Sequence, residues 1–119
     1  MIYEIYDYDA FKVAIDEICT QLSLRAISQD KVFDCRLISG ELIANVLQHS
    51  GGGARLQVEL CKGFVQILVK AERVFCPPNQ VECPQTDAER GRGIYLVDSL
   101  CSERTFSKDG EIIVKVSIE

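Results

Sequence analysis

Residues 55–70 read RLQVELCKGFVQILVK, and this stretch decides the fold class. In both of its halves every second residue is apolar, which is the period of a β-strand with one buried face. The apolar positions are Leu56, Val58, Leu60, Val65, Ile67 and Val69. Lys62-Gly63 between the halves is typical of a tight turn. We therefore expect an antiparallel hairpin whose inner face lies against a core.

Two helices are expected before the hairpin. Asp9 is expected to cap the first, residues 9–24, in which apolar residues recur at helical spacing. Ser28 is expected to cap the second, which ends at Gly51-Gly52-Gly53, because a run of glycine breaks a helix. A short strand at residues 2–5 opens the chain.

After the hairpin a long loop, residues 75–89, holds all three prolines. Gly91-Arg92-Gly93 then opens a third helix, and a strand is expected at residues 104–107. Asp109-Gly110 predicts a hairpin turn into a last strand at residues 112–118. The order β-α-α-β-β-loop-α-β-β predicts an α+β fold, a two-layer α/β sandwich with three helices on one face of the sheet.

The composition fits one globular domain spanning residues 1–119. With 13 Lys+Arg against 18 Asp+Glu the net charge is −5, which disfavours nucleic acid as a partner because phosphate contacts need clustered cations. No apolar run approaches the roughly 20 residues that cross a bilayer, so no membrane association is expected. The acidic N-terminus does not resemble a secretory signal, and we expect a cytoplasmic protein.

Six cysteines are many for this length, yet they form no C-x-x-C pair. His49 is the only histidine, so a zinc site is not indicated. We expect most of the cysteines to be small core residues without disulfides. Cys76 and Cys83 bracket a polar loop and are expected to be exposed.

The first candidate site is on the second helix, where Glu41, Asn45 and His49 recur every four residues and so share one face. An amide oxygen can bind Mg²⁺, and a carboxylate one turn earlier can accept a proton from a hydroxyl. The alternative is a polar helix edge with a histidine near the C-terminus, where a cation suits the helix dipole.

The second candidate is Gly91-Arg92-Gly93 at the start of the third helix. Glycines let the backbone approach a ligand, free helix amides attract an anion, and an arginine adds a charged fork. The alternative is a tight glycine loop that only enters the helix.

Together the two stretches resemble a known family. ELIANVLQH, residues 41–49, resembles the asparagine box of the GHKL ATPase superfamily, and ERGRGIYLV, residues 89–97, resembles its second glycine box. Both most resemble the boxes of the bacterial anti-sigma-factor serine kinases. The resemblance implies a GHKL-type (histidine-kinase-like) sandwich with a mixed, mostly antiparallel sheet.

The resemblance also implies roles for particular residues. Asn45 would bind the Mg²⁺ of Mg²⁺·ATP, with His49 beside it in the nucleotide-binding set, and Glu41 would be the general base. Gly91-Arg92-Gly93 would hold the phosphates, and residues 75–90 would form a lid over ATP.

The function implied is that of an anti-sigma-factor-like regulator, nominally an ATP-dependent serine/threonine kinase. Its partners would be a sigma factor or the antagonist protein that it phosphorylates, and a homodimer is compatible with this. The alternative is a protein-binding module of the same fold with weak or no nucleotide binding.

One departure supports this alternative. The aspartate that binds adenine in the family aligns with Ala71, and its two following glycines align with Arg73 and Phe75. Glu72 is one position out of register, which on a strand means the opposite face. Ile112 lies where the family usually places a threonine. Losing two polar contacts to adenine would weaken ATP binding by a factor on the order of 100.

Overall fold

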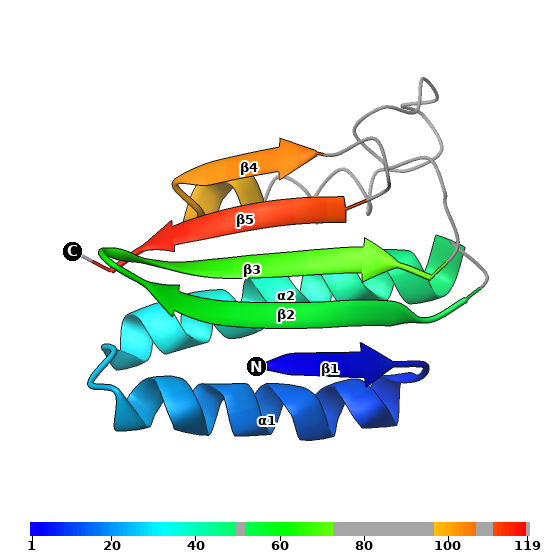
Figure 1. Ribbon diagram of the computed structural model, residues 1–119, viewed down its shortest axis with the longest axis horizontal. Helices are drawn as coiled ribbons and strands as arrows, with labels where there is room; N and C mark the ends of the chain where they lie inside the picture. Colours follow the sequence, from blue (N-terminus) through cyan, green and yellow to red (C-terminus); the bar gives the residue numbers. More distant parts are fainter. Residues whose placement is uncertain (50–51, 73–96, 107–110, 119) are drawn as a thin grey trace.

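The computed structural model of the chain describes residues 1–49, 52–72, 97–106 and 111–118. Its named elements are β1 (Ile2–Ile5), α1 (Tyr8–Leu24), α2 (Gln29–His49), β2 (Ala54–Cys61), β3 (Phe64–Ala71), β4 (Glu103–Phe106) and β5 (Glu111–Ser117) (Figure 1). Residues 97–100 are also helical and are the described part of the expected third helix.

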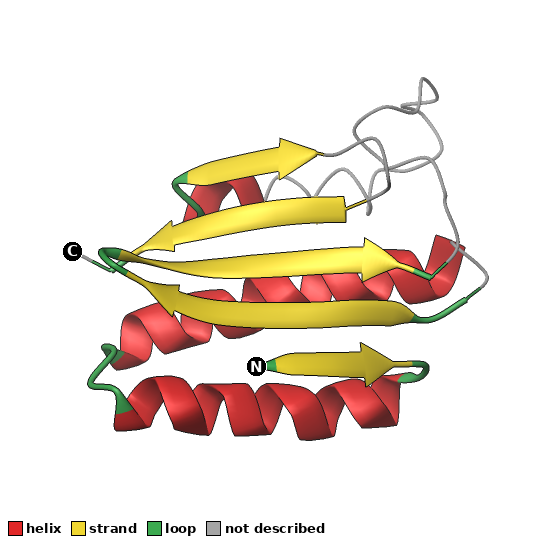
Figure 2. Ribbon diagram, viewed as in Figure 1, coloured by secondary structure: helices red, strands yellow, loops and turns green. Residues whose placement is uncertain are grey.

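The strands form one sheet in the order β1-β2-β3-β5-β4. Helix α2 packs against β2, β3 and β5, whereas α1 packs against β1 and α2 (Figure 2). The expected α+β two-layer sandwich is therefore confirmed. A mixed sheet was expected, but all strand pairs in the described part of the chain are antiparallel.

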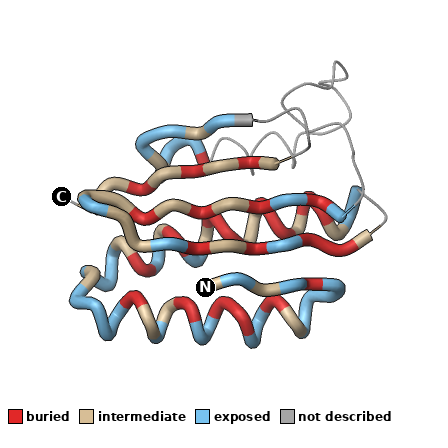
Figure 3. The backbone as a smooth tube through the Cα atoms, in the orientation of Figure 1, coloured by how far each residue is buried: buried red, intermediate tan, exposed pale blue. Residues whose placement is uncertain are grey.

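The hairpin that decided the fold class is present in the expected register. Val58 lies opposite Ile67 across β2 and β3, and both side chains are buried. Gly63 has a φ of 86°, a conformation that glycine adopts without strain, and this turns the chain between the strands. Buried and less buried residues alternate along β2, β3 and β5, as the two-residue period requires (Figure 3).

The cap expected at Asp9 is wrong by two residues. Helix α1 begins at Tyr8, and the Asp7 carboxylate accepts a 2.7 Å hydrogen bond from the Ala10 amide. Asp9 lies in the first turn, where its charge still suits the helix dipole. The cap at Ser28 is confirmed, since its Oγ accepts from the Lys31 amide at 3.4 Å.

Several expectations lie outside the described residues. These are the loop at residues 75–89, Gly91-Arg92-Gly93 and the Asp109-Gly110 turn. The end of the third helix is described, and Val97 there is fully buried, as its apolar pattern predicts. Among the described helices, none is long and apolar enough to cross a bilayer.

Candidate functional site

The three polar residues of α2 occupy different environments. Asn45 is only 6% exposed, whereas Glu41 is half-buried and His49, at the end of the helix, is exposed. Asn45 follows Glu41 by one turn and lies at the edge of the buried stripe formed by Ile38, Leu42 and Val46. The structure thus brings an amide into the protein interior and leaves a carboxylate near solvent.

The buried amide of Asn45 has an unsatisfied donor. Its Nδ2 finds no hydrogen-bond partner among the described residues, and the same is true of Ser39 Oγ. A buried donor without a partner costs about 1–3 kcal/mol, so such groups are rare unless a ligand or water completes them. Asn45 is therefore the strongest ligand-binding candidate on the helix.

Glu41 lines a groove between α1 and α2, together with Lys12, Gly40 and Ala44. This groove has a volume of about 430 Å³. A carboxylate at its rim can be reached by a side chain of another protein, as a general base for a protein substrate must be.

The position that the family resemblance assigns to adenine binding is occupied by an apolar residue. Ala71, at the end of β3, is 4% exposed and lies opposite Ala54 of β2. Ile112, at the start of β5, is also buried. Neither side chain can donate or accept a hydrogen bond, so these two positions have no means of recognising an adenine edge.

Glu72 lies on the other side of the chain, as its register predicts. Ala71 is buried and Glu72 is exposed. The Glu72 amide donates to the Gly53 carbonyl at 2.8 Å, and its carboxylate accepts from the Tyr6 hydroxyl. The negative charge of Glu72 is the main reason that the pKa of Tyr6 is raised, because it opposes formation of the phenolate.

The cysteines fit the core expectation only in part. Cys35 is buried, and burial raises the pKa of its thiol to about 12. Cys19, Cys61 and Cys101 are free thiols but only half-buried. In the described part of the chain no group of three or more potential ligands is arranged to hold a metal ion. Cys76 and Cys83 lie outside that part.

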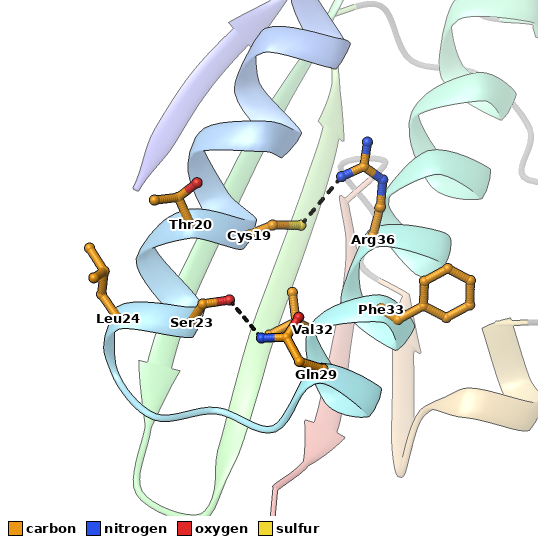
Figure 4. Close-up of a pocket in the computed structure, with 8 residues that line it drawn as sticks. All are labelled: Cys19, Thr20, Ser23, Leu24, Gln29, Val32, Phe33 and Arg36. Atoms are coloured by element: carbon orange, nitrogen blue, oxygen red, sulfur yellow. Dashed lines mark hydrogen bonds between the residues drawn. The ribbon is translucent and has the colours of Figure 1, made fainter.

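A second groove between α1 and α2 continues past Phe33 toward the far end of the helices, with a volume of about 460 Å³ (Figure 4). Arg36 spans the helices here, with Nη2 3.1 Å from Asp16 Oδ1 and Nη1 3.9 Å from Cys19 Sγ. These contacts tie α1 to α2 through groups that are largely exposed, and so contribute little stability.

The sequence interpretation missed a cleft between the start of α1 and the end of α2. It is lined by Tyr6 and Asp7 from the β1–α1 connection, by Tyr8 at the start of α1, and by Gln48 and Glu72 from distant segments. The available signal was two tyrosines on either side of an aspartate at the start of a helix. No periodicity marks them, because they lie where the turn passes into the helix.

Comparison with known proteins adds no assignment: no family model matches the chain, and no curated protein matches it.

Proposed function

We propose that this chain is a GHKL-type regulatory domain, an anti-sigma-factor-like protein that is nominally an ATP-dependent serine/threonine kinase. The observation that carries the proposal is the buried, unsatisfied amide of Asn45, one helical turn after a solvent-accessible carboxylate. A polar pair at this place in an apolar helix face lowers stability unless it serves a ligand.

The phosphate side of the site fits Mg²⁺·ATP. Asn45 offers an amide oxygen to the metal and an N–H donor to a phosphate oxygen. Glu41 would hold the proton of a partner serine hydroxyl. When bound, Mg²⁺·ATP supplies the phosphoryl group and the charge neutralisation that its transfer requires. Gly91-Arg92-Gly93 would cradle the phosphates, and His49 would complete the set.

The adenine side does not fit. Ala71 and Ile112 are buried and apolar, and Glu72 is directed toward Tyr6 instead. We therefore expect Mg²⁺·ATP to bind weakly, with a dissociation constant on the order of hundreds of micromolar or higher, because two polar contacts to the base are missing.

The second candidate is a binding module of the same fold that performs no phosphoryl transfer. The buried Ala71 favours it, because a site without base recognition has little selectivity for ATP. In this form the chain would hold its protein partner, a sigma factor or its antagonist, through surface contacts alone.

Titration calorimetry with Mg²⁺·ATP separates the two. Weak binding by the wild type that is lost in Asn45→Ala and kept in Gln48→Ala would support the nucleotide site, since Gln48 is an exposed amide on the same helix. If the wild type releases no heat at millimolar Mg²⁺·ATP, the nucleotide site is wrong and the module remains.

Transfer is tested with labelled ATP and the protein that co-purifies with the chain. Glu41→Ala should lower turnover by roughly 100-fold while leaving nucleotide affinity intact, as expected for a general base. Asp34→Ala, an acidic residue elsewhere on α2, is the matched control and should transfer at the wild-type rate. Equal loss in both variants would rule out the role of Glu41.

A further inference from the structure

The cleft between the start of α1 and the end of α2 has a volume of about 550 Å³ and is built from four separate parts of the chain. We call it the tyrosine cleft, lined by Tyr6, Asp7, Tyr8, Leu47, Gln48 and Glu72. The β1–α1 connection with the start of α1 forms one wall, and the end of α2 forms another. Gly52-Gly53 before β2 and Glu72 after β3 complete the lining. Asn45 is not among its described lining residues, but Tyr8 and Ala44 line both this cleft and the groove that holds Glu41, so the two adjoin.

Tyr6 is exposed yet held in place. The residue is 63% exposed, but its ring lies so close over Gly53 that a Cβ on that glycine would be 2.5 Å from Tyr6 Cδ1. Its hydroxyl is fixed by the Glu72 carboxylate. A large exposed side chain normally loses rotamer freedom when it binds a ligand, and here that loss has largely occurred on folding.

Tyr8 already attracts a cation. Lys12 Nζ lies 5.6 Å from the centre of the Tyr8 ring, within the range of a cation–π contact. Phe11 packs against the same ring at 5.7 Å between centroids, tilted by 57°. Tyr8 thus lines the cleft while its ring is packed against Phe11.

The charges lining the cleft are negative. Asp7 and Glu72 are its ionisable carboxylates, and no Lys or Arg is among its described lining residues. Asp7 is partly neutralised because it caps α1, so Glu72 carries most of the available charge. Nearby, Arg55 is paired with Glu4 at 2.8 Å. A carboxylate has about four acceptor positions, so the bond from Tyr6 leaves Glu72 able to accept more.

From this arrangement we propose that the tyrosine cleft binds an arginine side chain of a protein partner. The face of the planar guanidinium group can stack on the Tyr6 ring while its N–H groups donate to the Glu72 carboxylate. The methylene stem of the arginine would then lie on Leu47. The complementarity of charge and shape favours arginine over an apolar or acidic segment. The inference does not depend on nucleotide binding.

The test is an NMR titration of the full ¹⁵N-labelled chain without nucleotide. The probe is Nα-acetyl-arginine amide, and the matched ligand is Nα-acetyl-citrulline amide, which has nearly the same shape without the charge. We expect arginine to shift the amides of Tyr6, Tyr8, Gln48 and Gly53 with millimolar affinity, and citrulline to bind at least about fivefold more weakly. Equal shifts by both, or shifts spread over the whole acidic surface, would overturn the proposal.

Two charge-removing variants test whether the Glu72 carboxylate is the group that binds arginine. Glu72→Gln should weaken arginine binding by about threefold or more, as expected for a partly exposed ion pair. Glu59→Gln makes the same charge change at an exposed position of β2, outside the cleft, and should leave binding unchanged. A similar loss in both variants would attribute the effect to net charge and refute the cleft. Tyr6→Phe keeps the aromatic ring but removes the hydroxyl that bonds Glu72. This variant should bind arginine more weakly only because the Glu72 carboxylate is no longer held in place.

Discussion

Replacing Gly53 by alanine tests whether Tyr6 is held as the structure indicates. An added Cβ would lie 2.5 Å from Tyr6 Cδ1 and 2.7 Å from the Ile5 carbonyl oxygen. The exposed tyrosine ring can swing away, at the cost of its bond to Glu72. The Ile5 carbonyl cannot, because Ile5 is the last residue of β1 and pairs with Ala54. The end of β1 must therefore shift.

The magnitude follows from these two costs. Overpacking against a fixed backbone atom costs roughly 1–3 kcal/mol, and the lost hydrogen bond adds about 1 kcal/mol. Alanine recovers about 0.5 kcal/mol by restricting the unfolded chain. We expect a net loss of about 2 kcal/mol in the free energy of unfolding, or a fall in Tm of roughly 6–12 °C for a domain of this size.

Gly40→Ala is the matched control, because it makes the same chemical change where there is room. Its Cβ would lie 3.8 Å from Phe11 Cζ, an ordinary contact, inside α2. Alanine is the better helix former by about 1 kcal/mol, so this variant should melt higher than the wild type. Thermal unfolding followed by circular dichroism measures both. If Gly53→Ala melts at or above the wild-type temperature, the close packing of Tyr6 and β1 on Gly53 is wrong.

Three further predictions concern the interior. Asn45→Ala should raise the free energy of unfolding by about 1 kcal/mol in urea titrations without ligand, because it removes the unsatisfied donor, and a loss of stability would show that the amide is already satisfied. Ala71→Asp should tighten Mg²⁺·ATP by roughly tenfold or more in calorimetry, since it restores one contact to the base, and no gain would mean that the pocket is filled. Burial raises the pKa of Cys35 to about 12, so the folded state holds this proton more tightly than the unfolded state does. Stability contributed by this thiol should be complete below pH 9 and fall as pH rises toward 12, which urea titrations of wild type and Cys35→Ala at pH 8 and 10 would reveal.

Strands β2, β3 and β5 were predictable because buried and less buried positions alternate along most of each one, and one buried face leaves only one register open to such a strand. The cap at Asp7 was harder to predict from the sequence, because Asp7 and Asp9 are both good capping residues and lie two positions apart. Which of them caps the helix depends on the residue at which β1 ends. Sequence spacing put Glu41, Asn45 and His49 on one face but could not predict their different burial. That burial depends on which other elements cover each turn of α2, which is a property of the tertiary structure.

The charge of the tyrosine cleft and the apolar character of position 71 both follow from which side of the sheet each residue at the end of β3 faces. A carboxylate at residue 71 would point to the helix side of the sheet, where Ala71 is buried. The carboxylate stands instead at residue 72, on the opposite side, where it fixes Tyr6 and gives the cleft its charge. Under our proposals, the position expected to bind the base therefore lacks a polar group, whereas the cleft expected to bind arginine has a carboxylate. We therefore expect Ala71→Asp to change nucleotide affinity without changing arginine binding, and Glu72→Gln to do the reverse. A variant that changed both affinities together would show that the two surfaces are one site.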